Sequence, residues 1–438
     1  MGISASATRT RGQAARSVHI PPDSSTAAST AAGSITSLWI TWIGESESEG
    51  VRESAHVKLL AIWGWRHKPQ HPHANNLHLL HSLNLLFCRG TTLTQIPTPK
   101  PLLETLRGTR QAVPPLWLMR QAGRYLPEYR ALRAEKGGFL DLVNDSEAAA
   151  EVTLQPLRRF GFDGSILFSD ILVVPNALGQ DLWFETGEGP RLAPKIDRAT
   201  LASLQPAPER LEPVYGTVRR VKAALDPAVT FLGFAGAPWT VATYMIAGQG
   251  SREQAEARRL AYLDPELMTA LLDRIVGLTI DYLSAQIDAG VDAVQLFDSW
   301  AGSLSPEQFE RWVIAPTTRI VEAVKARHPD TPIIGFPKGA GGKLVAYAEA
   351  TGVDAVGLDE TVDPVWANAA LPRDLPVQGN LDPLALIAGG ETLDRAVDRI
   401  LAAFADRPHI FNLGHGIQQD TPIAHVEQLV ARVRRSQA

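Results

Sequence analysis

A short stretch near residue 120 concentrates groups that bind anions. Its sequence is "WLMRQAGRYLPEYRALR", and its four arginines are Arg120, Arg124, Arg130 and Arg133. Guanidinium groups stay charged and form paired hydrogen bonds with carboxylates or phosphates, so the cluster indicates an anion site. The alternative is that these arginines pair on the surface with acids such as Glu128. Because the formal net charge of the chain is -5, an anion site must be local.

Other residues that could do chemistry follow short apolar runs. Asp170 lies in "SILFSDILVV"; an unpaired buried carboxylate is costly, so contact with a ligand and pairing with an arginine stay equally open. His415 lies in a Gly-His-Gly loop. Its imidazole could be exposed to a ligand, or the residue could have a structural role. Tyr244 and Ser299 follow two other runs and, taken singly, indicate packing or turn positions. Lys338 leaves open an aldolase-like Schiff base, although the glycines beside it are typical of a solvated loop.

Eight apolar runs predict the strands that position these residues. Their apolar character is continuous, which is typical of parallel strands buried on both faces. The runs are "LWLM" at 116–119, "SILFS" at 165–169, "TFLGFA" at 230–235, "AVQLF" at 293–297, "PIIGF" at 332–336, "DAVGL" at 354–358, "LPVQG" at 375–379 and "HIFNL" at 409–413. Helical segments alternate with them, so residues 98–438 are predicted to form a single (β/α)8 barrel, with a doubly wound open sheet as the alternative. In a barrel, polar residues that follow the strands converge on one mouth.

Capping residues and a repeated phrase predict where helices begin and end. Asp264 is predicted to open a long helix that Gly290 ends, and Thr421 precedes the last helix. The phrase Gly, apolar, Asp, small recurs as "GFDG" at 161 and as "GVDA" at 290 and 352, each time between a helix and a strand. No "GxGxxG" follows the first predicted strand, so nothing indicates a dinucleotide site.

Composition excludes several classes of protein. Hydrophobic residues make up 45% and charged residues 20% of the chain, as in globular proteins. No run approaches the roughly 18 apolar residues of a membrane span, and no basic footprint indicates nucleic-acid binding. The single cysteine, Cys88, excludes an intramolecular disulfide and a Cys-rich metal site, and it fits a reducing compartment such as the cytoplasm.

Residues 1–97 differ from the rest and are predicted to be an N-terminal extension. Residues 1–44 are rich in Ser, Ala and Thr and have one acid, as in a transit peptide. The alternatives are a disordered segment or an over-extended reading frame, because no methionine separates Met1 from Met119. Four histidines fall close together but match no common zinc spacing, so no metal site is predicted. They are His71, His73, His78 and His81.

Seven phrases, in this order, resemble one family. They are "LWLMRQAGRYLPEYR", "FSDILVVPNALG", "GFAGAPWTVATYM", "QLFDSWAG", "GFPKGAG", "QGNLDP" and "NLGHG". From about Pro99 to the C-terminus the chain resembles uroporphyrinogen decarboxylase, and "MRQAGRYLPEYR" and "FSDIL" are highly specific to that family. One departure is "GLDET" at 357–361, where "GLDWT" is more usual, so a role for Glu360 is in doubt.

The resemblance implies an activity and residue roles. The family removes carbon dioxide from the four acetate groups of uroporphyrinogen III, a tetrapyrrole with eight carboxylates, giving coproporphyrinogen III without a metal or an organic cofactor. Asp170 matches the acid that binds the central pyrrole N–H groups. The matched cleft arginines are Arg120, Arg124 and Arg133, and the side chains matched to the carboxylate surroundings are Tyr244, Ser299 and His415. A cytoplasmic homodimer is likewise implied by the resemblance.

The chemistry needs an electron sink, and a pyrrole can supply its own. Protonating the ring gives an iminium-like cation that accepts the electrons left by carbon dioxide, so no pyridoxal or thiamine is required. Asp170 is expected to stabilise that cation. The proton donor stays open between Arg120, Tyr244 and a carboxyl of the substrate, since arginine is a poor acid with a pKa of about 12.5 or more.

The same residues leave two rival functions to compare with the decarboxylase. A corrinoid-linked methyltransferase of the same superfamily uses a zinc site with Cys and His ligands, and no cysteine follows Pro99. A non-catalytic tetrapyrrole carrier would keep the cleft without turnover, and the presence of every matched polar residue argues against it.

Overall fold

The structure is a computed structural model that describes residues 98–185, 189–251 and 253–435. The chain divides into two units, Met1–Thr91 and Thr92–Ala438, and every described residue belongs to the second. The predictions for the N-terminal extension, including the four clustered histidines, lie outside the described residues. Among the helices that are described, none is both long enough and apolar enough to cross a membrane.

Seven parallel strands form the central sheet, in the order β1-β4-β5-β6-β7-β8-β9. These strands are β1 (Gly164–Ile166), β4 (Thr230–Gly236), β5 (Ala293–Asp298), β6 (Ile333–Pro337), β7 (Ala355–Gly357), β8 (Val377–Gln378) and β9 (His409–Ile410). The first predicted strand is reduced to one parallel bridge, Leu116 to Phe411, beside β9. On its other side, the segment around Leu116 contacts the start of β1, where Asp163 N donates to Leu116 O at 2.9 Å. This segment therefore closes the sheet as the eighth member of a (β/α)8 barrel, as predicted.

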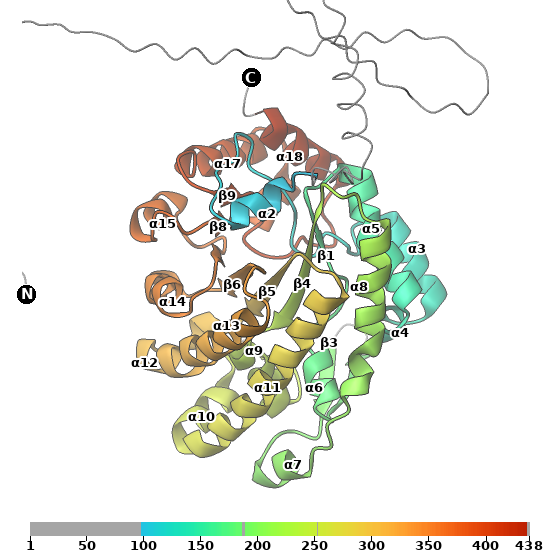
Figure 1. The fold of residues 1–438 in the computed structure, drawn as a ribbon, viewed down its shortest axis with the longest axis vertical. Coiled ribbons are helices and arrows are strands. Elements are labelled where there is room, and N and C mark those ends of the chain that lie inside the picture. The colour runs from blue at the N-terminus through green and yellow to red at the C-terminus, as the bar shows by residue number, and fades with distance from the viewer. Residues whose placement is uncertain (1–97, 186–188, 252, 436–438) are drawn as a thin grey trace, which may run out of the picture. The chain divides into compact units, whose positions relative to one another are not determined.

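Helices surround the strands, as Figure 1 shows. The longer ones are α3 (Pro127–Lys136), α5 (Ser146–Phe160), α8 (Glu212–Ala224), α9 (Pro238–Ala247), α10 (Ala255–Leu263), α11 (Pro265–Ala289), α13 (Ala315–Arg327), α17 (Gly390–Ala403) and α18 (Ile423–Arg435). The shorter ones are α2 (Pro101–Leu106), α4 (Phe139–Asn144), α6 (Val173–Ala177), α7 (Arg198–Ser203), α12 (Pro306–Phe309), α14 (Leu344–Ala350), α15 (Pro364–Ala370) and α16 (Pro383–Ala388). Four single turns are η1 (Pro208–Leu211), η2 (Ala301–Ser303), η3 (Glu310–Ile314) and η4 (Gly341–Lys343).

The predicted helix boundaries at α11 and α18 are confirmed. The Asp264 side chain accepts a hydrogen bond from Leu267 N at 3.0 Å and caps the N-terminus of α11. Gly290 follows the last residue of α11 with φ 122, a backbone conformation that favours glycine. Thr421 lies just before α18, which buries one apolar face.

The repeated Gly-x-Asp phrase has a structural explanation. In each copy the aspartate lies just before a strand and accepts a backbone N–H near the start of the strand segment beside it. Asp163 accepts Leu116 N at 2.7 Å. Asp292 accepts Phe231 N at 2.8 Å, and Asp354 accepts Ile333 N at 2.7 Å. The phrase therefore sets the register between neighbouring strands at the amino end of the barrel. Contacts at this end stabilise the barrel, because the chemistry of such folds takes place at the carboxyl end.

A polar chain crosses the barrel interior. Trp117 Nε1 donates to Gln378 Oε1 at 2.9 Å, and Gln378 Nε2 donates to Gln295 Oε1 at 3.1 Å. Strands β5 and β8 are not neighbours in the sheet, so this bond must span the interior. All three side chains are fully buried, and the hydrogen bonds offset the cost of burying their polar atoms.

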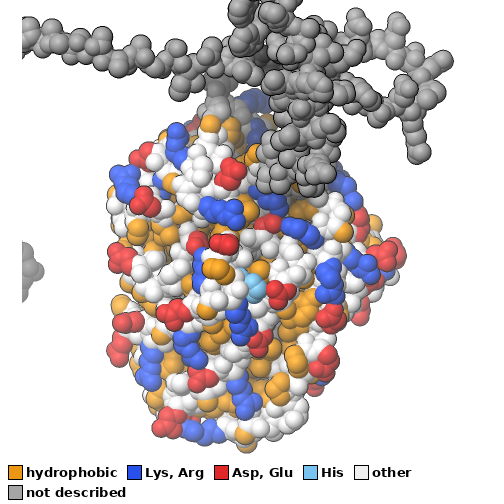
Figure 2. Space-filling model, in the orientation of Figure 1, with side chains coloured by type: hydrophobic (Ala, Val, Ile, Leu, Met, Phe, Trp, Pro, Cys, Tyr) orange, Lys and Arg blue, Asp and Glu red, His pale blue; other side chains and the backbone are white. Residues whose placement is uncertain are grey.

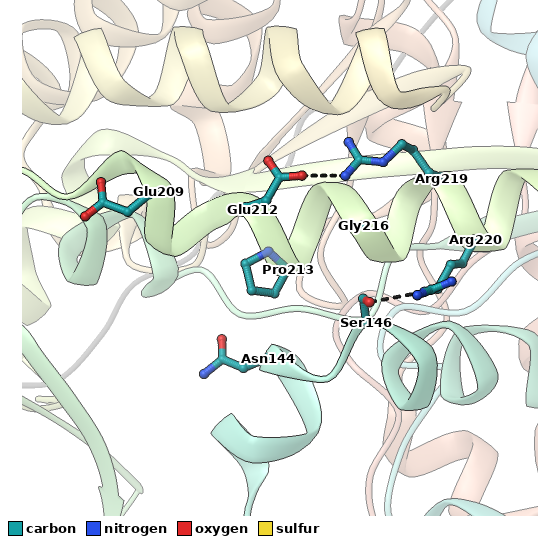
Figure 3. Close-up of a pocket in the computed structure, with 8 residues that line it drawn as sticks. All are labelled: Asn144, Ser146, Glu209, Glu212, Pro213, Gly216, Arg219 and Arg220. Carbon is teal, nitrogen blue, oxygen red and sulfur yellow. Dashed lines mark hydrogen bonds and ion pairs between the residues drawn. The ribbon is translucent and has the colours of Figure 1, made fainter.

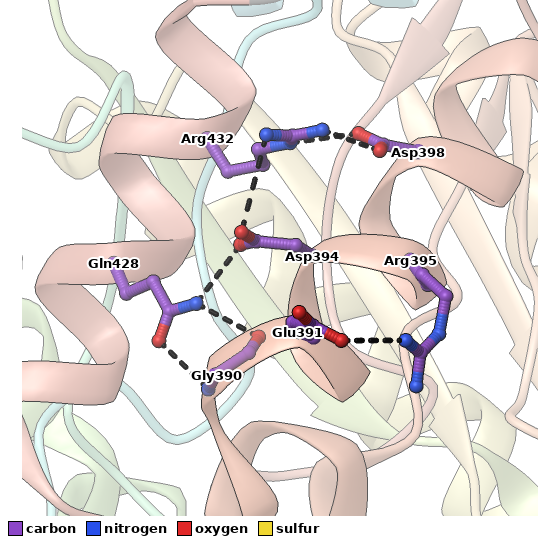
Figure 4. Close-up of polar contacts among 7 residues, drawn as sticks. All are labelled: Gly390, Glu391, Asp394, Arg395, Asp398, Gln428 and Arg432. Carbon is purple, nitrogen blue, oxygen red and sulfur yellow. Dashed lines mark hydrogen bonds and ion pairs between the residues drawn. The ribbon is translucent and has the colours of Figure 1, made fainter.

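Polar contacts join the last two helices, as Figure 4 shows. Arg432 on α18 pairs with Asp398 on α17, with its Nε 2.8 Å from Asp398 Oδ1. One turn earlier, Gln428 Nε2 donates to Asp394 Oδ1 at 2.9 Å. These contacts fix α18 beside α17.

One element was not predicted from the sequence. Strands β2 (Asp181–Glu185) and β3 (Gly189–Ala193) form an antiparallel hairpin outside the central sheet. Residues of β2 alternate between exposed and partly buried, and β3 is partly buried apart from the buried Leu192, so the hairpin lacks the continuous apolar character that identified the barrel strands.

Candidate active site

Arg120 lies in a strained turn that its neighbours hold. Its φ is 61, which is uncommon for a residue other than glycine. Gln121 is fully buried and accepts Leu118 N at 3.2 Å through Oε1, while its Nε2 donates to Gly164 O at 3.1 Å. Asn412 Oδ1 accepts Met119 N at 2.9 Å. The turn is thus tied to β1 and to the chain after β9, and this fixes where the Arg120 side chain begins.

Asp170 follows β1, and its environment raises its pKa. The side chain is partly buried, and burial raises the pKa of its carboxyl to about 6. The Leu172 N–H, which donates to Asp170 Oδ1 at 2.8 Å, and the positive charge of Arg120 both oppose this increase. The group is therefore an ionised carboxylate at neutral pH whose charge is poorly solvated, as is common in active sites.

Tyr244 lies on α9 near Asp170. Burial raises the pKa of its phenol, and so does the charge of Asp170. A hydrogen bond with the Trp300 side chain and the charge of Arg120 oppose this increase. The rings of Tyr244 and Trp300 have centroids 6.5 Å apart. Ser299 is the residue before Trp300 and is partly buried at the end of β5. The phenol therefore keeps its proton at neutral pH and can donate it in a hydrogen bond.

His415 is a neutral imidazole in this setting. Its pKa is lowered to about 3, mainly by burial and also by the positive charges of Arg120 and Lys338, against the opposing charge of Asp359. The glycines on both sides are required by close contacts. A Cβ on Gly416 would collide with the side chain of Arg120. A Cβ on Gly414 would likewise collide with the backbone of Glu360, so the Gly-His-Gly loop packs tightly against the mouth.

The structure brings four of the seven predicted site residues into one electrostatic group. Arg120 interacts with Asp170, Tyr244 and His415, which come from separate strand ends. Ser299 lies beside this group through its neighbour Trp300. The convergence follows from parallel strands that all end at the same side of the barrel.

Arg124 and Arg133 lie around a different side chain. Both lower the pKa of Tyr129, against its burial, which raises it. Arg133 also stacks over the Phe139 ring, 5.7 Å from the centroid. Tyr129 in turn contacts Phe168, two residues before Asp170, with ring centroids 5.8 Å apart. These two arginines therefore flank the Arg120 group rather than belonging to it.

The predicted alternative, pairing of the cleft arginines with Glu128, is wrong. Glu128 instead forms a paired contact with Arg159, at 2.8 and 2.9 Å. Within the part of the chain that the structure describes, no carboxylate lies in ion-pair contact with Arg120, Arg124 or Arg133. Their guanidinium groups are thus available to the carboxylates of a ligand. Arg130 has a structural role, since it donates to Arg124 O and Tyr125 O at 2.6 and 3.1 Å.

Lys338 and Glu360 form an ion pair that sequence reasoning did not find. Lys338 Nζ is 3.4 Å from Glu360 Oε1. The ion pair engages Lys338 as an ammonium group, whereas a Schiff base needs a free amine, so the aldolase alternative loses its support. The departure at Glu360 from the usual family tryptophan thus places a charged partner beside Lys338. A strand-end lysine and a strand-end acid on neighbouring strands were the available signal.

Neither of two surface depressions contains the predicted site residues. One, of about 630 Å³, lies among α4, α5, η1 and α8, where Glu212 pairs with Arg219 and Ser146 with Arg220 (Figure 3). The other, of about 340 Å³, is lined by residues after β6 and β7 that include Thr361 and Trp366. On the face drawn in Figure 2, basic and acidic side chains are interspersed. Among described residues, no three His, Cys, Asp or Glu side chains are grouped to hold a metal ion.

This fold, with a charged group at the carboxyl ends of its strands, defines a (β/α)8-barrel enzyme. A family model described as uroporphyrinogen decarboxylase (URO-D) matches residues 97–436, so the chain belongs to that family. It is therefore a carboxy-lyase of porphyrin and haem biosynthesis.

Curated relatives agree with this assignment, and a solved structure shares the fold. The uroporphyrinogen decarboxylase of Sphingopyxis alaskensis is 73% identical over 337 residues, which cover 77% of this chain and 98% of the relative. That of Rhizorhabdus wittichii is 72% identical over 335 residues, or 76% of this chain and 97% of the relative. A methyltransferase from Methanosarcina mazei has a similar fold, with a TM-score of 0.65 at 18% identity over 77% of this chain and 98% of that protein.

Proposed function

We propose that the mouth of the barrel decarboxylates the four acetate groups of uroporphyrinogen III through Asp170, Arg120 and Tyr244. The observation that carries the proposal is that Arg120, which forms no ion pair with a carboxylate among the described residues, lies near enough to Asp170 for its charge to lower the pKa of that carboxyl. An unpaired cation beside a poorly solvated carboxylate suits a substrate that carries both pyrrole N–H groups and carboxylates. Asp170 accepts the central N–H groups and stabilises the ring cation as it forms.

Each turnover of one acetate group balances without an external electron acceptor. A proton adds to the pyrrole α-carbon, the bond from the methylene carbon to the carboxylate breaks, and its electron pair moves into the ring as carbon dioxide leaves. A second proton then adds to the methylene carbon to give a methyl group, and the ring loses the first proton. The net consumption is one proton per carbon dioxide released. We therefore propose that the substrate itself is the electron sink.

The arginines orient the substrate in this proposal. Arg120, Arg124 and Arg133 bind carboxylates of the macrocycle, which holds the reacting acetate in a productive position. His415 accepts or donates one hydrogen bond as a neutral imidazole, because its lowered pKa removes it as a source of protons at neutral pH. Ser299 completes the contacts to the carboxylates from the end of β5.

Two substitutions distinguish Tyr244 from Arg120 as the proton donor. Tyr244→Phe removes the phenol proton and keeps the ring beside Trp300, whereas Arg120→Lys keeps a cation with a different shape. If Tyr244 donates, Tyr244→Phe lowers kcat far more than it changes KM. If Arg120 donates, Tyr244→Phe retains most of the kcat.

Formation of coproporphyrinogen by the purified protein, without added metal, tests the catalytic assignment against a tetrapyrrole carrier. Asp170→Asn should bind uroporphyrinogen and lose turnover. Asp181→Asn, at the exposed start of the β2–β3 hairpin, is a matched control that should retain it. Equal turnover in the two variants would refute the role of Asp170.

We also propose that residues 98–438 form the catalytic barrel as a homodimer in the cytoplasm. Family membership supports the location and the assembly. We place the dimer contact on three large, exposed apolar side chains in the first turns of α15 and α16, beside the mouth. Val365 is 60% exposed, Trp366 39% and Leu384 59%. Sedimentation of wild type and Trp366→Lys tests it, since a monomeric variant is expected and an unchanged mass would refute this surface.

A further inference from the structure

Asp298 is a buried carboxyl to which the reaction assigns no role. It is the last residue of β5, directly before Ser299, and is 1% exposed. Its Oδ1 accepts the hydroxyl of Thr240 at 2.5 Å. Its Oδ2 is buried without a hydrogen-bond partner, and among described residues no Lys, Arg or His side chain pairs with it.

Thr240 connects Asp298 to the turn that follows β5. The Thr240 oxygen accepts Trp300 N at 3.0 Å, so the hydroxyl proton points to Asp298 and Asp298 Oδ1 acts as an acceptor. Trp239 Nε1 donates to Trp300 O at 3.2 Å. Both backbone polar groups of Trp300 are therefore held by neighbouring residues of α9, and Asp298 fixes the orientation of one of them.

Trp300 transmits this arrangement to Tyr244. The two rings have centroids 6.5 Å apart, and the Trp300 side chain forms a hydrogen bond that lowers the pKa of the phenol. Tyr244 lies one turn after Thr240 on the same helix. The path from the buried carboxyl to the phenol thus consists of one hydroxyl and one indole.

We propose that Asp298 is a positioning residue for the decarboxylation, which holds the Tyr244 phenol in place through Thr240 and Trp300. We rest this on the role proposed for Tyr244. Positioning matters because a displacement of about 1 Å can lower a rate by about a hundredfold. The carboxyl acts through its acceptor oxygen alone, so a neutral acid or an amide can serve in its place.

The surroundings of Asp298 favour the neutral acid. Burial raises its pKa to about 7, against the opposing hydrogen bond from Thr240. The other groups that face it are the buried phenol of Tyr347, from α14, and the backbone N–H groups of Thr240 and Trp300, which lower its pKa. Asp298→Asn would keep the acceptor at Oδ1 and remove the titration.

The test compares kcat, KM and the melting temperature among variants of the full chain. Thr240→Val removes the link, and Asp298→Asn preserves it. Thr217→Val is a matched control, because Thr217 is equally buried and its hydroxyl donates only to Pro213 O, at 3.0 Å. Thr240→Val should lower kcat by about tenfold to a hundredfold with KM unchanged. Asp298→Ala, which removes the acceptor, should lower kcat as Thr240→Val does. Thr217→Val should keep the wild-type kcat, and Asp298→Asn, which keeps the acceptor, should recover most of the kcat that Asp298→Ala loses.

Three outcomes would overturn the proposal. Wild-type kcat in Thr240→Val would show that the link does not position Tyr244. A kcat loss in Thr240→Val matched by Thr217→Val, with a parallel fall in melting temperature, would show a structural effect only. A kcat loss in Asp298→Asn as large as in Thr240→Val would show that the charge, not the acceptor, is used.

A double-mutant cycle separates this proposal from the role of Tyr244 itself. If Asp298 acts through Tyr244, adding Thr240→Val to Tyr244→Phe lowers kcat little further. Full additivity, with Tyr244→Phe impaired, would refute the positioning path alone. Wild-type kcat in Tyr244→Phe would refute the proposed role of Tyr244 and the positioning path with it.

Discussion

Replacing Asp170 by asparagine should abolish most activity and, at the same time, stabilise the fold. The substitution keeps an acceptor for the Leu172 N–H, which donates to Asp170 Oδ1 at 2.8 Å, and removes only the charge. Loss of the charge removes stabilisation of the cationic ring, an effect of about a hundredfold or more in kcat for a comparable electrostatic group. The same charge destabilises the unliganded fold, because burial raises the pKa of the Asp170 carboxyl.

The magnitude follows from the pKa of Asp170. It rises from 3.8 to about 6 in the folded protein. One pKa unit corresponds to about 1.4 kcal/mol, so the ionised carboxylate lowers the free energy of unfolding by at most about 3 kcal/mol. The folded state binds the proton more tightly than the unfolded state, so this cost is complete above about pH 7 and disappears as the pH falls through 3.8.

Urea unfolding of wild type and Asp170→Asn at two pH values measures this effect. The variant should be more stable by about 3 kcal/mol near pH 8 and by roughly half as much near pH 5. In wild type, kcat/KM should fall on the acid side with a midpoint near pH 6, as Asp170 takes up a proton. A variant that is equally stable at both pH values, or near-normal turnover in it, would refute the reasoning.

Three further predictions concern other parts of the chain. The ring protons of His415 should not titrate between about pH 5 and pH 8 in NMR spectra, because its pKa is lowered to about 3; a midpoint near 6.5 would contradict its burial. Arg407→Met should lower the free energy of unfolding by about 3 kcal/mol in urea, since the buried guanidinium donates to backbone carbonyls that include Pro372 O and Leu375 O; an unchanged midpoint would disprove its structural role. Removing residues 1–95 should leave kcat and melting temperature nearly unchanged, because the family match begins at residue 97; a large loss of either would contradict this.

Seven of the eight predicted strands correspond to strands of the barrel, and the reason is local. Each run is apolar on both faces because parallel barrel strands are covered inside and outside. The eighth run, at 116–119, forms only the bridge from Leu116 to Phe411, since the chain turns at Arg120 soon afterwards. The β2–β3 hairpin escaped prediction because it lacks the continuous apolar runs that identify the barrel strands.

The candidate site was only partly accessible from sequence. The position of Asp170, Ser299 and His415 after apolar runs indicated that they share the barrel mouth. The separation of Arg124 and Arg133, around Tyr129, from Arg120 was not predictable, because it depends on the direction that α3 takes after the turn. The ion pair of Lys338 with Glu360 likewise depends on which strands are neighbours.

The sequence by itself determined the barrel, its family and the types of side chain at the strand ends, because apolar runs, glycine caps and specific phrases are properties of short segments. Only the tertiary structure decided which of those side chains interact. The charge of Arg120 acts on Asp170, 50 residues later in the chain, and on His415, 295 residues later. Burial is the larger cause at both groups, and their pKa values are about 6 and about 3. Protonation at the site depends on solvent exclusion and on charges from distant strands, which no local pattern records.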